Sequence, residues 1–75
     1  MEELLEILKE LHEDVDYETC DNLVDGKILD SFDIVTLIGE ISTTFDIQIK
    51  AKEIVPENFN SMQAMYKMIE RLQDE

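Results

Sequence analysis

Apolar residues recur every three or four positions in three stretches of the chain, which is the spacing of amphipathic α-helices. The pattern predicts a first helix over residues 2–13 and a second over residues 31–45. A last helix is expected to begin after Asn60 as its N-cap, with Gln63 three residues later. The expected buried stripes are Leu4, Leu8, Leu11 and Val15, then Ile34, Val35, Leu37, Ile38, Ile41 and Phe45, and finally Met62, Met65, Tyr66, Ile69 and Leu72.

The segments between these helices differ in character. Residues 14–29 form a long acidic connection that contains the turn signal Asp25-Gly26. Three of its apolar residues could hold it on the core: Leu23, Val24 and Ile28. Residues 50–54 predict a short helix that stops ahead of Pro56. We therefore expect an all-α fold, a small four-helix bundle of three main helices plus one short helix, with a long loop between helices 1 and 2.

Length and charge narrow the functional classes. The 75 residues are enough for a single domain, residues 1–75, and 44% hydrophobic residues argue against disorder. The net charge of −13, from 19 acids and 6 bases, disfavours nucleic acid and anionic membranes and favours partners with basic patches. No apolar run approaches a membrane-spanning length, and the acidic start predicts no signal peptide. We expect a cytoplasmic protein.

The acidic connection partly matches a calcium-binding loop. Asp14, Asp16 and Glu18 occupy the first, third and fifth positions of that pattern. Thr19 stands where the sharp turn needs glycine, and Asp25 stands where a bidentate glutamate is needed. We interpret this segment as a solvated acidic loop.

The single cysteine, Cys20, cannot form an internal disulfide, and its sequence neighbours include no lysine, arginine or histidine that would stabilise a thiolate. It is interpreted as a half-buried structural residue. Methionines at helical spacing in the last helix are interpreted as core residues that fill gaps, not as a metal or cofactor site. No metal site is predicted.

Ser31 stands at the start of the second helix, after Asp30 as N-cap and ahead of Asp33 as an approximate capping-box partner. A catalytic serine needs a neighbouring base, and the only histidine, His12, is expected to be a solvated residue on the polar side of the first helix. Free backbone N–H groups and the helix dipole at this position would favour an attached phosphate. Position alone leaves an ordinary polar residue and a modification site equally open.

The stretch LDSFDIVTLIGEISTTFDIQI resembles the signature of acyl carrier proteins, in which Asp-Ser-Leu opens the second helix. FDIQI resembles the family's loop into its short third helix, and FNSMQAMYKMIERL resembles its final helix, so the resemblance covers essentially the whole chain. It implies that Ser31 carries 4′-phosphopantetheine, attached by a separate phosphopantetheinyl transferase. It also implies a free-standing, monomeric acyl-carrier-type domain without enzymatic activity, which holds an acyl or aminoacyl group as a thioester.

The departures from the family pattern bear on the partners. Phe32 replaces the leucine after the serine, and the exposed face of the second helix is expected to carry Glu40 as its only acid. These departures imply loading by a dedicated ligase or acyltransferase in a specialised pathway, and not ordinary fatty-acid synthesis. The residues expected to dock partner enzymes are Asp30, Phe32, Asp33, Thr36, Leu37 and Glu40. The alternative is an acidic helical interaction module without a prosthetic group that binds a basic protein partner.

Overall fold

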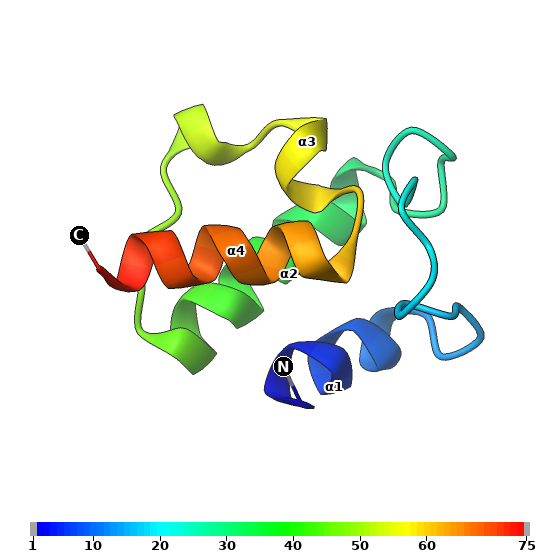
Figure 1. The fold of residues 1–75 in the computed structure, drawn as a ribbon, viewed down its shortest axis with the longest axis horizontal. Helices are drawn as coiled ribbons and strands as arrows, with labels where there is room; N and C mark the ends of the chain where they lie inside the picture. Colours follow the sequence, from blue (N-terminus) through cyan, green and yellow to red (C-terminus); the bar gives the residue numbers. More distant parts are fainter. Residues whose placement is uncertain (1, 75) are drawn as a thin grey trace.

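The computed structural model describes residues 2–74, and they form an all-helical fold. In chain order the elements are α1 (Glu2–Leu11), α2 (Ser31–Phe45), the 3₁₀ helix η1 (Ala51–Glu53), α3 (Pro56–Phe59) and α4 (Met62–Gln73). α1 packs against α2 and α4, and α3 packs against α4. Figure 1 shows the long connection between α1 and α2 looping out at one end of the bundle. The expected bundle of three main helices with a long first loop is confirmed.

The core lies where α1, α2 and α4 meet, and the long connection contributes to it. Tyr17, Leu23 and Leu29 of the connection are at most 2% exposed. Val24 and Ile28 pack against the core while remaining partly exposed, so the expected anchoring of this loop is confirmed. The fully buried helical residues include Leu4, Leu8, Leu37, Ile41, Met65 and Ile69. Burial of such a side chain contributes about 1.5–3 kcal/mol to the stability of the fold, and this packing holds α2 in place.

The expected start of the last helix is wrong by one residue. Ser61 is the N-cap of α4, and its hydroxyl accepts a hydrogen bond from the Ala64 backbone N–H at 3.0 Å. Asn60 is instead the C-cap of α3, and its side-chain oxygen accepts hydrogen bonds from the backbone N–H groups of Val24 and Asp25, each at 3.0 Å. The side chain that could have capped α4 therefore holds the long connection.

Pro56 starts a short helix that the sequence pattern did not predict. It is the first residue of α3, a position where the missing backbone N–H would have no helical acceptor and the fixed φ suits the helix. The short helix expected over residues 50–54 is narrower, a 3₁₀ turn over Ala51–Glu53. The expected stop ahead of Pro56 is confirmed, and α3 is a further short element that the sequence pattern did not predict.

One member of the expected stripes lies outside the core. Val35 is 67% exposed, because the stripe predicted for α2 is wider than the side that faces α1 and the core. Tyr66 on α4 is partly buried and packs against the core, and Met68 beside it is buried. α1 ends at Leu11 and not at residue 13. Within residues 2–74 no helix is both long enough and apolar enough to cross a membrane.

Candidate functional site

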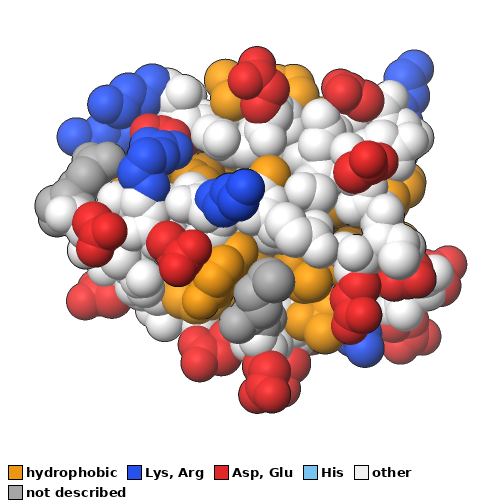
Figure 2. All heavy atoms as spheres, viewed as in Figure 1, with side chains coloured by type: hydrophobic (Ala, Val, Ile, Leu, Met, Phe, Trp, Pro, Cys, Tyr) orange, Lys and Arg blue, Asp and Glu red, His pale blue; other side chains and the backbone are white. Residues whose placement is uncertain are grey.

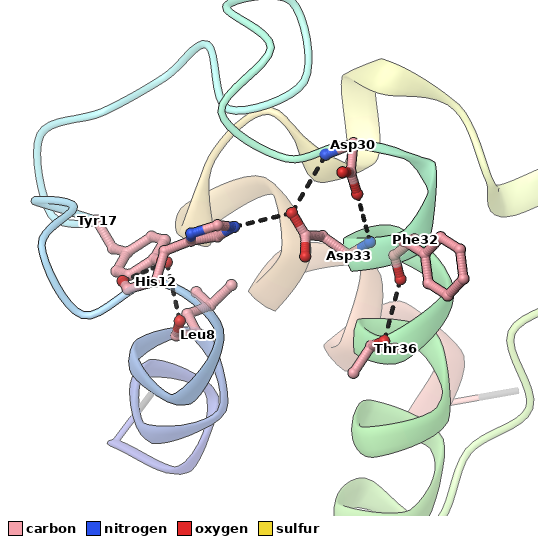
Figure 3. Close-up of polar contacts among 7 residues, drawn as sticks. All are labelled: Leu8, His12, Tyr17, Asp30, Phe32, Asp33 and Thr36. Atoms are coloured by element: carbon pink, nitrogen blue, oxygen red, sulfur yellow. Dashed lines mark hydrogen bonds and ion pairs between the residues drawn. The ribbon is translucent and has the colours of Figure 1, made fainter.

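The entrance of α2 is a reciprocal capping box. The Asp30 side chain accepts the Asp33 backbone N–H at 2.9 Å, and the Asp33 side chain accepts the Asp30 backbone N–H at 3.3 Å. Two backbone donors that the helix itself leaves unpaired are thereby satisfied. Figure 3 shows both bonds at the first turn of the helix. The predicted cap and its partner are confirmed, and they fix Ser31 at the first helical position.

Ser31 is exposed, and its hydroxyl has no hydrogen-bond partner among residues 2–74. It borders a shallow, largely apolar hollow of about 230 Å³ whose other lining residues are Phe32 and Val35. These two side chains are 82% and 67% exposed. Sequence reasoning placed Val35 in the core and missed it here, although its three-residue spacing from Phe32 puts the two on one helix face. An unengaged hydroxyl thus stands beside an uncovered apolar surface.

His12 is not the solvated residue that its position on the first helix suggested. It lies just past the end of α1, and its Nε2 is 2.8 Å from Asp33 Oδ2. Figure 3 shows the ring directed at the Asp33 carboxylate, across the gap between α1 and α2. Sequence patterns could not reveal this contact, since 21 positions separate the two residues.

The pair shifts the protonation of both partners. The hydrogen bond from His12 lowers the pKa of Asp33 below 3.8, and the same bond raises the pKa of His12 above 6.5. Nearby, burial raises the pKa of Tyr17 to about 12. Because His12 is engaged with Asp33, it is not directed at Ser31, and the chain provides no second histidine as a base. Among residues 2–74 no histidine is therefore placed to activate Ser31 as a nucleophile.

The six expected docking residues differ in their exposure to solvent. Asp30, Phe32, Thr36 and Glu40 are exposed, and the side chain of Asp33 is 21% exposed. Leu37 is the correction: it is 0% exposed, because its position on α2 faces α1 and the core and not the outer face. Leu37 supports the helix and offers no surface to a partner.

Other candidate chemistry finds little support. Cys20 is half-buried as expected, with its Sγ 3.2 Å from Asn22 Oδ1. Among the described residues no group of three or more His, Cys, Asp or Glu side chains could hold a metal ion, and that includes the acidic connection. A Cβ added at Gly39 would meet no described atom within 4 Å, so this glycine is not required by packing.

The charge is distributed unevenly along the chain. Residues 1–49 hold 14 acids and two bases, whereas residues 50–75 hold five acids and four bases. Figure 2 shows several basic side chains at the left and centre of the visible face, others at its right edge, and acidic side chains around most of its outline. Ser31 therefore belongs to the strongly acidic part of the chain.

In comparisons with known proteins, no family model matches the chain, and no solved structure matches it.

Proposed function

We propose that the protein is a carrier that holds an acyl or aminoacyl group as a thioester on a 4′-phosphopantetheine arm attached to Ser31. The observation that carries this proposal is the exposed, unengaged Ser31 hydroxyl at the first position of a capped helix, beside the apolar hollow of Phe32 and Val35. The sequence resemblance to acyl carrier proteins supplies the identity of the arm.

Attachment would require an external enzyme, because no histidine among residues 2–74 is directed at Ser31. The Ser31 oxygen bonds to the phosphorus of the pantetheine phosphate of coenzyme A, and its proton passes to a base of the transferase. Adenosine bisphosphate leaves as the phosphoanhydride bond breaks. The arm, when bound, supplies a thiol for the cargo. The backbone N–H groups at the first turn of α2 and the helix dipole favour the phosphodiester.

Partner enzymes would dock on the outer face of α2. Phe32 and Val35 offer an apolar contact there, while Asp30 and Glu40 are exposed acids on the same helix and its cap. The acidic character of residues 1–49 favours partners with basic rims, which increase association rate and specificity more than affinity. With few acids on this face, we propose a dedicated loading ligase or acyltransferase in a specialised pathway.

The test is the intact mass of the full chain after incubation with coenzyme A and a broad-specificity phosphopantetheinyl transferase. The expected result is one added phosphopantetheine, mapped to Ser31 by peptide analysis. Ser31→Ala should remain unmodified with unchanged helical content. The matched control is Ser42→Ala, which removes a hydroxyl from the same helix and should be modified like the original chain.

The rival function is an acidic interaction module without a prosthetic group. The uncovered Phe32 and Val35 and the acidic first part of the chain would also serve such a module. No added mass on the original chain would overturn the carrier proposal in favour of this rival. Added mass that persists in Ser31→Ala would show that the attachment site is wrong.

A further inference from the structure

His12 joins two helices through the capping box that precedes Ser31. Its Nε2 contacts Asp33 Oδ2 at 2.8 Å, and this same oxygen accepts the Asp30 backbone N–H at 3.3 Å. One carboxylate oxygen therefore links the end of α1 to the N-cap of α2. On the α2 side these contacts involve Asp30, directly before Ser31, and Asp33, two positions after it.

The backbone of His12 is fixed, so its side chain is held in place for this contact. The His12 backbone N–H donates to the Leu8 carbonyl at 3.0 Å, which continues the hydrogen bonding of α1. The Tyr17 hydroxyl donates to the carbonyl oxygens of Leu8 and His12, each at 2.8 Å, as a shared bond. Tyr17 is 1% exposed, and Figure 3 shows its ring beside His12. The ring of His12 therefore projects from an anchored position.

The groups that face His12 are acidic. Asp33 contacts it directly from α2, Asp30 lies at the N-cap of α2, and Asp14 lies on the connection, while Tyr17 bonds its backbone. The contact with Asp33 and the fields of these carboxylates raise the pKa of His12. The side chains of His12 and Asp33 are 35% and 21% exposed, so solvent protons can reach the pair.

We propose that His12 is a positioning residue for the modification of Ser31: it holds Asp33 against the Asp30 backbone and, when protonated, offsets the negative charge at the entrance of α2. This inference rests on the proposed function. Protonated His12 keeps its contact with Asp33 at the first turn of α2 and places one positive charge there. Deprotonation leaves the Asp30 and Asp33 carboxylates beside Ser31 without a compensating charge, which disfavours arrival of an anionic donor.

Protonation and modification are then linked in both directions. A phosphodiester on Ser31 adds negative charge next to Asp30 and Asp33, and this charge stabilises the imidazolium of His12 further. Thermodynamic reciprocity requires that, if the phosphodiester raises the proton affinity of His12, protonation favours the modified state by the same factor. The pKa of His12 should therefore be higher in the modified protein than in the unmodified protein.

The first measurement is the initial rate of modification by the transferase from pH 6 to pH 9, taken as the ratio of original chain to variant so that the enzyme's own pH dependence cancels. For His12→Gln we expect a ratio of about two to five at the acidic end, the range that an exposed ion pair provides, falling toward one as His12 deprotonates. His12→Lys keeps a cation at every pH in this range, so its rate should stay near the acidic value of the original chain. Lys9→Gln, which removes an exposed positive charge from α1, should show a flat ratio.

The second measurement is the NMR titration of the His12 ring proton and the Asp30 amide. In the unmodified chain the Asp30 amide should titrate with the midpoint of His12, and in His12→Gln this titration should be absent. In the modified chain the His12 midpoint should rise.

A flat Asp30 amide, or a His12→Gln rate ratio that does not change with pH while modification proceeds, would overturn this inference and leave the carrier function intact. Failure of every variant and of the original chain to be modified would overturn the carrier function instead. In that case the Asp30 amide in the unmodified chain still decides whether His12 controls the entrance of α2.

Discussion

Two junctions of the molecule are each closed by an ion pair, but the pairs differ in kind. At the junction of η1 and α4, both terminal nitrogens of Arg71 donate to the carboxylate of Glu53. The Glu53 side chain is 7% exposed, and the Asn58 amide donates to its backbone carbonyl at 2.7 Å. The arginine pairing lowers the pKa of Glu53, and arginine keeps its charge at every ordinary pH.

The junction of α1 and α2 is closed by one contact that titrates. His12 meets Asp33 through a single nitrogen, and both side chains are accessible to water. The guanidinium of Arg71 stays charged and bonds the shielded Glu53 carboxylate at every ordinary pH, whereas the charge of the His12 imidazole depends on pH. The difference teaches that the half of the bundle with η1 and α4 is a constant support. The half with Ser31 is the half whose closure can respond to its surroundings.

The largest expected effect comes from breaking the permanent junction. Arg71→Met leaves the shielded Glu53 carboxylate without its cation, so Tm should fall by on the order of 10 °C in a thermal melt. The double variant Glu53→Gln/Arg71→Met should recover part of this loss, because the shielded side chain at position 53 then carries no charge. A single variant that melts like the original chain would show that the two junctions are not different in strength.

The second effect tests the anchor behind the titratable junction. Tyr17→Phe removes the hydroxyl that holds the Leu8 and His12 carbonyls, and should lower the free energy of unfolding by about 0.5–1.5 kcal/mol in a urea titration. Tyr66→Phe is the matched control, since its hydroxyl has no hydrogen-bond partner among residues 2–74 and it lies away from this junction on α4. Equal stability of the two variants would contradict the anchoring role.

A substitution remote from both ion pairs serves as a reference for the two junctions. Gly39→Ala on the exposed part of α2 should increase the free energy of unfolding by about 0.5–1 kcal/mol, because alanine favours the helix and its Cβ meets no described atom within 4 Å. Its pH dependence of stability should match that of the original chain. Destabilisation in the urea titration would mean that a close approach at Gly39 has been missed.

The smallest effect is the pH dependence of the titratable junction. The raised pKa of His12 gives stability that is fully present below 6.5 and is lost as the pH rises through its higher folded value. The lowered pKa of Asp33 gives stability that is present above 3.8 and is lost as the pH falls through its lower folded value. The difference in unfolding free energy between the original chain and His12→Gln should therefore be largest between these values, at about 0.2–1 kcal/mol.

The difference between the two chains is the quantity to measure, because the net charge of −13 also changes the stability of each chain with pH. A constant difference from pH 5 to pH 9 would show that His12 does not contribute through its charge.

Local sequence signals were sufficient for much of the fold. The bounds of α2 and the Asp30–Asp33 capping box follow from residues that lie next to each other in the chain, and the structure has them as predicted. Leu23 is one of the apolar residues of the acidic connection that are expected to hold it on the core, and it is 0% exposed.

The errors arose where a distant segment decides the role of a residue. Asn60 suits an N-cap by type, but the backbone of residues 23–25 takes its carbonyl and side-chain oxygens. Val35 and Leu37 are both apolar and nearly adjacent, and only the side of α2 that faces α1 and the core separates the exposed one from the buried one. The contact of His12 with Asp33 has the same origin, which is why the candidate site was predicted without it.

The buried position of Tyr17 also makes this side chain an intrinsic optical probe of the protein. The chain has no tryptophan and two tyrosines, so its tyrosine absorbance and tyrosine emission come from Tyr17 and Tyr66. Burial raises the pKa of Tyr17 to about 12, and tyrosinate absorbance from this ring should therefore appear late in an alkaline titration. In Tyr66→Phe, emission and absorbance would report on Tyr17 alone. Opening of the segment after α1 could then be followed with light, without any added label.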